Sequence, residues 1–143
     1  MARLAALFAL LATPVGAWEF RADPVCTIEH ENSGGQVTVT FDPLSRLYGI
    51  DLTLAEGQWP DAPAFGILFA GGNQIQIGTD RHQLLEDGAT LRVTDKGFGN
   101  VLDGLEFNLR AFAKTGGQIF VFELMEAAPA VQAFRDCGTT LSS

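Results

Sequence analysis

The sequence is short of the side chains that bind metals and short of positive charge. Its 143 residues include two cysteines and two histidines, too few for a zinc finger or an iron–sulfur cluster. Nine lysines and arginines oppose seventeen aspartates and glutamates, which gives a net charge of −8. A protein that grips phosphate backbones needs clustered positive charge, so we expect no nucleic-acid partner.

No apolar run approaches the roughly 20 residues of a membrane-spanning helix. The first run, residues 4–12, follows a positively charged start and leads into a helix-breaking, small-residue segment that ends at Ala17. This order is typical of a bacterial Sec-type signal peptide, with cleavage between Ala17 and Trp18. The alternative is an uncleaved amphipathic anchor. We predict a periplasmic protein without stable membrane insertion, in which a signal peptide over residues 1–17 precedes a single domain over residues 18–143.

The two cysteines, Cys26 and Cys137, lie near opposite ends of that domain. In an oxidising compartment the simplest expectation is one disulfide between them. On the chain-entropy model, closing so long a loop stabilises the fold by roughly 4–5 kcal/mol. The alternative is a pair of reactive thiols or metal ligands, but the sequence has no CxxC and no flanking histidine to mark one.

Most of the domain alternates between apolar and polar residues and is interrupted by turn-forming Gly, Asn, Asp and Pro. Turn signals at intervals of roughly 8–12 residues favour a mainly β domain, either a single antiparallel β-sandwich or a small barrel of about eight short strands. One C-terminal helix over residues 127–136 is expected to bring Cys137 to the first strand. A turn or single helical turn is expected over residues 98–104. The expected strands are residues 25–30, 36–41, 47–54, 65–69, 74–78, 89–94, 105–113 and 119–124.

The strongest polar group is Thr79, Asp80, Arg81 and His82, with Asp95 a short distance along the chain. His82 is a candidate general base if Asp80 or Asp95 orients its ring. The sequence has no GxSxG motif to supply a nucleophile. The alternative interpretation is that Asp80 caps a turn while Arg81 and His82 pair with carboxylates.

Metal and cofactor sites find little support. His30, His82 and Met125 do not form a copper or zinc motif, and neither HExxH nor CxxCH is present. The segment 95–100 with Asp103 offers oxygen ligands for Ca²⁺ but lacks the spacing of an EF-hand. Its glycines are expected to serve turns with positive φ. Because no phosphate-binding loop is present either, we expect no cofactor.

Trp59 lies in an acidic, Pro-containing loop over residues 55–64. An exposed indole there would anchor a partner or ligand. Alternatively, the indole folds back and fills the edge of the core. Arg81 and His82 are the other candidate binding residues.

Three segments resemble small uncharacterised exported alphaproteobacterial proteins, some of which carry an excinuclease ABC name: residues 79–82 (TDRH), 97–104 (GFGNVLDG) and 133–137 (AFRDC). The resemblance covers the whole mature chain. It implies export, whereas the excinuclease name does not suit an acidic chain without a phosphate-binding loop. More distantly, the early Trp18, the flanking cysteines, the strands and the closing helix are similar to the invasion-associated locus B family. That likeness implies a periplasmic β-sandwich whose late segment packs back on the sheet.

Together these observations favour a small periplasmic binding or protein-interaction module, stapled by one disulfide, whose partner is a periplasmic protein or a small ligand. Its working surface would involve residues 55–64 and 79–87. Two alternatives belong to other classes. One is a periplasmic hydrolase that uses His82 with Asp80 or Asp95, and the other is a carrier of a small apolar ligand.

Overall fold

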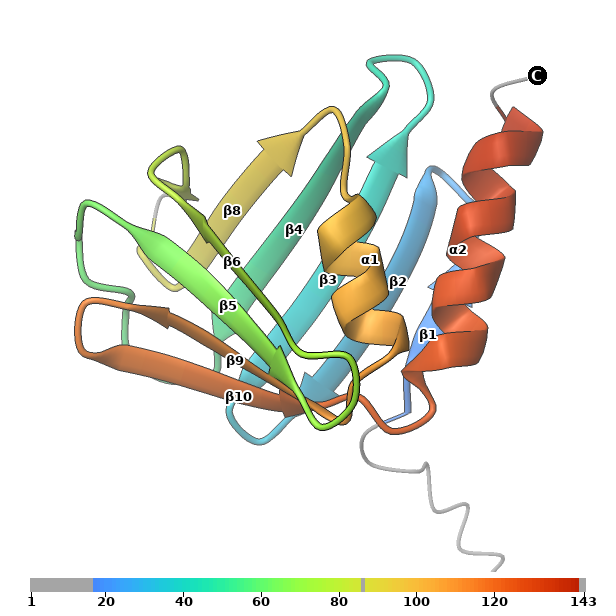
Figure 1. Ribbon diagram of the computed structural model, residues 1–143. Coiled ribbons are helices and arrows are strands. Elements are labelled where there is room, and N and C mark those ends of the chain that lie inside the picture. The colour runs from blue at the N-terminus through green and yellow to red at the C-terminus, as the bar shows by residue number, and fades with distance from the viewer. Residues whose placement is uncertain (1–16, 86, 142–143) are drawn as a thin grey trace, which may run out of the picture.

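The computed structural model describes residues 17–85 and 87–141, which form two antiparallel sheets with two helices at one side (Figure 1). In spatial order, the first sheet contains β1 (Glu19–Arg21), β2 (Cys26–Asn32), β3 (Gly35–Asp42), β4 (Leu47–Leu54), β8 (Thr90–Asp95) and β7 (Gln83–Leu84). The second sheet contains β10 (Gln118–Glu123), β9 (Arg110–Thr115), β5 (Phe65–Ala70) and β6 (Ile75–Thr79). The helices are α1 (Gly99–Glu106) and α2 (Ala127–Leu141).

The predicted fold class is confirmed as a mainly β sandwich with a C-terminal helix. The described strands form two separate sheets and do not close into a barrel. Residues 17–85 and 87–141 contain ten strands rather than about eight, because β1 and β7 are pairings of only three and two residues. Such short pairings have no alternation in the sequence to mark them.

Local alternation placed the hairpins correctly. β2 pairs with β3, β5 with β6 and β9 with β10, all antiparallel. In β3, Val37 and Val39 are fully buried, while the intervening Thr38 faces outward and is half-buried. A period of two therefore sends one face of the strand into the core and the other toward water.

The expected strand over residues 105–113 is wrong in its first half. Leu105 and Glu106 belong to α1, and β9 begins only at Arg110. The buried residues Val101, Leu102 and Leu105 follow helical spacing. Phe107 and Leu109, which the alternation predicted to be inward, are 51% and 59% exposed.

Close packing fixes α1 between the second sheet and α2. Gly104 lies so near Phe69 of β5 that an added Cβ would be 2.3 Å from the ring. After the helix, the Asn108 side-chain amide donates to the carbonyls of Gly104 and Asn73, at 3.1 and 2.8 Å. On the opposite side, Arg135 of α2 donates to carboxylates of α1. The position of α1 is therefore set by contacts with both neighbours.

The predicted disulfide is confirmed. Cys26 of β2 and Cys137 of α2 are bonded, with their Cα atoms 6.0 Å apart and a sequence separation of 111. Both cysteines are buried. The bond ties the last helix to the first sheet, beside β1 and β2 (Figure 1).

Residues 1–16 of the predicted signal peptide lie outside the described residues. Trp18, the predicted first residue after cleavage, is packed into the domain: its indole stacks on His30 at 4.8 Å and donates to the Glu123 carbonyl at 3.0 Å. Within the described part of the chain, no helix combines the length and the apolar character needed to cross a bilayer.

Candidate functional site

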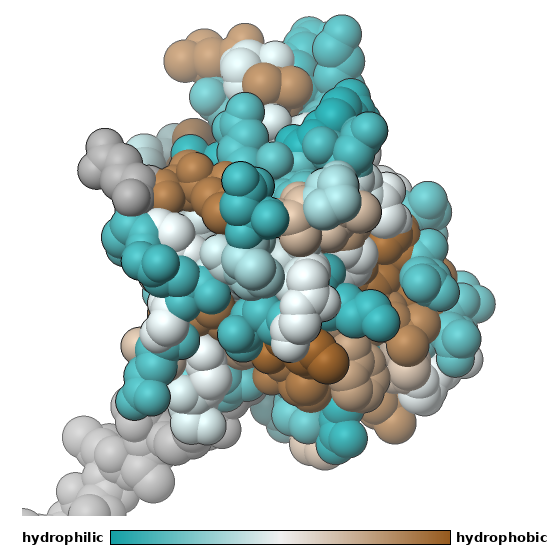
Figure 2. Space-filling model, turned by 90° about the vertical axis from the view of Figure 1, so that its left-hand side faces the viewer, coloured by the Kyte–Doolittle hydropathy of each residue, from teal (hydrophilic) through white to brown (hydrophobic). Residues whose placement is uncertain are grey.

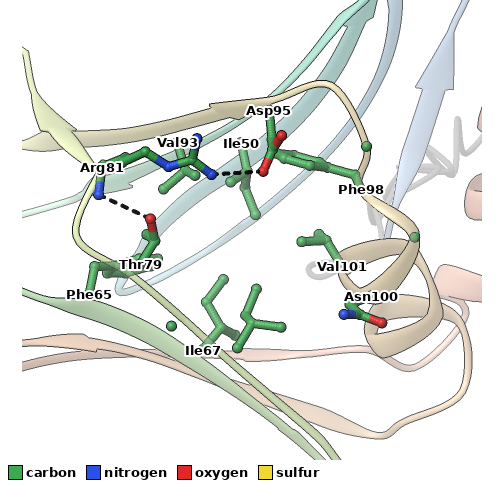
Figure 3. Close-up of a pocket in the computed structure, with 14 residues that line it drawn as sticks. Ile50, Phe65, Ile67, Thr79, Arg81, Val93, Asp95, Phe98, Asn100 and Val101 are labelled. Atoms are coloured by element: carbon green, nitrogen blue, oxygen red, sulfur yellow. Dashed lines mark hydrogen bonds and ion pairs between the residues drawn. The ribbon is translucent and has the colours of Figure 1, made fainter.

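A cleft of about 440 Å³ opens between the two sheets, next to the start of α1 (Figure 3). We call it the inter-sheet cleft. Both sheets and the helix contribute to its lining, which brings together segments far apart in the sequence. The strands contribute Ile50 of β4, Phe65 and Ile67 of β5, Ile77, Gly78 and Thr79 of β6, and Val93 and Asp95 of β8. The rest of the lining is Arg81 in the segment after β6, Gly97 and Phe98 before α1, and Gly99, Asn100 and Val101 of α1.

The floor of the inter-sheet cleft is apolar. Five of its lining side chains belong to the buried core, namely Ile50, Phe65, Ile67, Phe98 and Val101. Partly buried Ile77 and Val93 continue this surface toward the opening. In Figure 3, Ile67 and Val101 point into the space from opposite sides. Such a floor favours the hydrocarbon part of a ligand over water.

At the cleft the two sheets stand apart, and the exposed Arg81–Asp95 pair spans the rim of the space between them. On the other side of the sandwich, the Asn32 side chain donates to the Val121 carbonyl at 3.0 Å, and Trp18 donates to Glu123. These two bonds join the first sheet to the edge strand β10. The edge strand of the second sheet on the cleft side, β6, has no partner strand beyond β5 among the described residues.

Glycines leave the cleft open at the α1 end. An added Cβ at Gly97 or at Gly99 would meet no heavy atom within 4 Å. Neither residue is among the described glycines with positive φ, so the expectation that they serve positive-φ turns is wrong. Neither backbone geometry nor crowding therefore requires glycine here. What these two positions provide is empty space at the mouth of the cleft.

Polar groups occupy the rim. The Arg81 guanidinium donates to the Asp95 carboxylate at 3.2 Å. The backbone amide of Arg81 donates to the Thr79 hydroxyl at 3.0 Å. The other oxygen of Asp95 accepts from the amide of Lys96 at 2.6 Å. The Arg81 and Asp95 side chains are 72% and 44% exposed, so solvent screens their attraction. A weak ion pair thus crosses the rim above an apolar floor.

The first turn of α1 faces the same opening. Its preceding residue, Phe98, makes no side-chain cap hydrogen bond, and the first backbone bond of the helix is from Leu102 to Phe98. The amides of Gly99, Asn100 and Val101 consequently have no intrahelical acceptor.

His82 lies outside the lining of this cleft. Its Nε2 is 3.0 Å from the Ala62 carbonyl and must donate to it. In the neutral ring Nδ1 is then the acceptor, and this atom is buried without a hydrogen-bond partner. Among the described residues, no hydrogen bond or ion pair joins His82 to Asp80 or Asp95: Asp80 is exposed, and Asp95 pairs with Arg81. The structure therefore brings Arg81 and Asp95 together but not a histidine–carboxylate pair.

Trp59 occupies the edge of the core. It is 3% exposed, its indole donates to the Leu52 carbonyl at 2.9 Å, and its ring meets Phe65 edge-on at 6.3 Å. Its backbone amide donates to the Gly88 carbonyl, which docks the 55–64 loop on the turn before β8. The structure favours the interpretation of a core-edge indole over that of an exposed anchor.

The acidic residues considered for Ca²⁺ are engaged elsewhere. Asp95 pairs with Arg81, and Asp103 accepts from Arg135 at 2.7 Å. In the described chain, no group of three or more His, Cys, Asp or Glu side chains is arranged to hold a metal ion.

Two other hollows that described residues line have a less apolar base. One, of about 320 Å³, lies beside Gly66 and Thr115, and the other, of about 470 Å³, lies beside Asn32 and Gln118. Each has only two buried side chains in its lining, against five in the inter-sheet cleft. Figure 2 shows the left-hand side of the molecule as drawn in Figure 1, where hydrophobic patches are interrupted by hydrophilic residues. The inter-sheet cleft is therefore the strongest candidate site.

The sequence points to Arg81 and Asp95 at the rim of this site, whereas nothing in it marks the apolar floor. The residues of this apolar surface come from β4, β5, β6, β8 and the start of α1, and each resembles an ordinary core residue in its own segment. The available signal was the pair Gly97 and Gly99 flanking Phe98. No family model, curated protein or solved structure matches this chain, so its site is interpreted from its own geometry.

Proposed function

We propose that this chain is a small exported binding module that holds an apolar or amphipathic small molecule in the inter-sheet cleft. The observation that carries the proposal is a cleft of about 440 Å³ with a buried apolar floor and a polar rim. Ligand sites typically measure roughly 300–1,000 Å³ and combine apolar walls with a few polar groups. Of the hypotheses raised by the sequence, binding of a small ligand has the most support.

The fold supports binding with a largely preformed site. Phe98 and Val101 form one side of the apolar floor, and α1, which begins just after Phe98, is held by the Gly104–Phe69 contact and by Arg135. The disulfide in turn fixes α2, which carries Arg135. A preformed wall lowers the cost of ordering side chains when a ligand enters.

The apolar floor alone gives weak binding. A ligand chain of about eight methylene groups gains roughly 6 kcal/mol on leaving water. Association costs at least about 4 kcal/mol in lost motion. A ligand therefore needs a polar group that finds a partner at the rim to bind tightly.

Export belongs to the same proposal. The N-terminal sequence has the form of a Sec signal peptide, and a buried disulfide suits an oxidising compartment. Mass spectrometry of the exported protein is expected to show Trp18 as its first residue. Retention of residues 1–17 would contradict periplasmic release.

The ligand proposal is tested with a neutral apolar fluorophore, N-phenyl-1-naphthylamine. Titration of the folded protein is expected to show saturable one-to-one binding. Gly99→Leu should abolish it by placing a side chain in the mouth of the cleft, at a position where an added Cβ meets no heavy atom within 4 Å. Gly117→Leu is the matched control, because Gly117 also has open space around it and lies in the β9–β10 turn, outside the cleft lining. Equal binding by both variants would overturn the proposal.

A further inference from the structure

We infer that the ligand of the inter-sheet cleft is an amphiphile with a carboxylate head, which Arg81 binds at the rim while its hydrocarbon chain lies on the apolar floor. This inference rests on the proposed function and narrows it to one class of ligand.

Arg81 is the one positively charged side chain among the described residues that line the cleft. It lies directly after β6, where its amide bond to Thr79 holds its backbone at the rim. In Figure 3 its side chain extends across the opening toward Asp95, with Phe65 and Ile67 below. A head group bound to this guanidinium would therefore leave its chain directed at the floor.

Among the arginines that form described ion pairs, Arg81 is the one held least firmly by its carboxylate partner. Its contact with Asp95 is the longest of these pairs at 3.2 Å, and its side chain is the most exposed at 72%. By contrast, Arg92 holds Asp51 through two bonds of 2.7 and 2.8 Å. A guanidinium has five N–H donors, and the described side-chain contact of Arg81 uses one. It can therefore bind a second carboxylate.

The chemistry of Arg81 selects the kind of head group. A guanidinium presents parallel donors that match the two oxygens of a carboxylate, and such charge-assisted bonds are stronger than neutral ones. A neutral hydroxyl offers a single acceptor. A carboxylate should therefore bind about tenfold more tightly than an alcohol with the same chain.

Asp95 opposes the binding of a carboxylate and therefore provides a second test of the inference. Its negative charge lies beside the position proposed for the head group. When Arg81 turns to a ligand, the Lys96 amide still holds one oxygen of Asp95. Removing the charge in Asp95→Asn should therefore raise the affinity for a carboxylate severalfold, although it breaks an ion pair.

The experiment displaces N-phenyl-1-naphthylamine from the folded protein with decanoate or with decanol. Decanoate is expected to compete about tenfold better. Arg81→Gln should remove this preference while decanol competes as before, and Asp95→Asn should increase it. Arg110→Gln is the matched control, because Arg110 pairs with Glu123 outside the cleft lining.

The possible results show whether the carboxylate inference fails, or whether the proposed function itself fails. If the fluorophore binds but decanoate and decanol compete equally, or neither competes, the carboxylate inference is wrong and the proposed cleft still stands. If Arg81→Gln weakens both competitors alike, Arg81 does not select a carboxylate and the inference is again wrong. If the fluorophore does not bind the unmodified protein, the proposed function itself fails.

Discussion

Gly104 of α1 rests directly on the ring of Phe69 in β5. An added Cβ would lie 2.3 Å from that ring, and the helix backbone cannot retreat without disturbing its contacts with α2. This contact places the first turn of α1 at the mouth of the inter-sheet cleft. The shape of the candidate site therefore depends on one glycine near the other end of the helix.

Gly104→Ala should destabilise the protein by about 1–3 kcal/mol because the core beside Phe69 has no room for a methyl group. Gly99→Ala is the matched control on the same helix. It meets nothing and should be neutral or stabilising by up to about 1 kcal/mol, since alanine favours helix. Urea denaturation measures both changes. Equal stability of the two variants would contradict the packing described for α1.

Replacing both cysteines, in Cys26→Ser with Cys137→Ser, should lower the free energy of unfolding by roughly 4–5 kcal/mol through loss of a 111-residue loop closure. Denaturation of the two proteins without reductant provides the measurement. Thiol labelling of the unsubstituted protein, unfolded without reductant, should find no free cysteine. Two labelled thiols would show that the disulfide is absent.

Trp59→Phe should cost about 1–2 kcal/mol, because the Leu52 carbonyl loses its indole donor in a buried position. The matched change Trp18→Phe removes the other indole, which donates to Glu123. In the Trp18→Phe protein the remaining Trp59 should emit at short wavelength and resist aqueous quenchers. Strong quenching of that emission would mean that Trp59 is exposed, as an anchor for a partner requires.

His82→Ala should cost about 1 kcal/mol from loss of the bond to the Ala62 carbonyl, with binding in the inter-sheet cleft unchanged. The physical reason is that the ring lies outside the cleft lining and its Nδ1 is buried. Urea denaturation and the fluorophore titration measure the two effects. Loss of binding in a variant that remains folded would place His82 in the site after all.

Local patterns in the sequence predict much of this fold. The hairpins follow from alternation and turn residues, and the disulfide follows from two cysteines taken together with the predicted export signal. The error at α1 arises because Leu105, Phe107 and Leu109 also alternate by chance. Helical spacing of Val101, Leu102 and Leu105 competes with that pattern, and the contact with Phe69 decides between them.

The candidate site is less predictable because it depends on how distant segments pack. Arg81 and Asp95 were candidates from the start, yet their contact with each other depends on the path of the chain between β6 and β8. Ile50 and Ile67 line a cleft only because the two sheets stand apart there. The burial of Trp59 likewise depends on Leu52 and Gly88, which no local pattern connects to it.

The most direct test of a ligand site between the sheets is a map of backbone amide NMR shifts during titration with decanoate. The account predicts that the largest shifts occur at lining residues such as Ile67, Val93 and Val101. It also predicts that the exposed residues Ile119 and Val121, on the outer face of the second sheet, change little. Shifts concentrated on that outer face, or no saturable shifts at all, would contradict it.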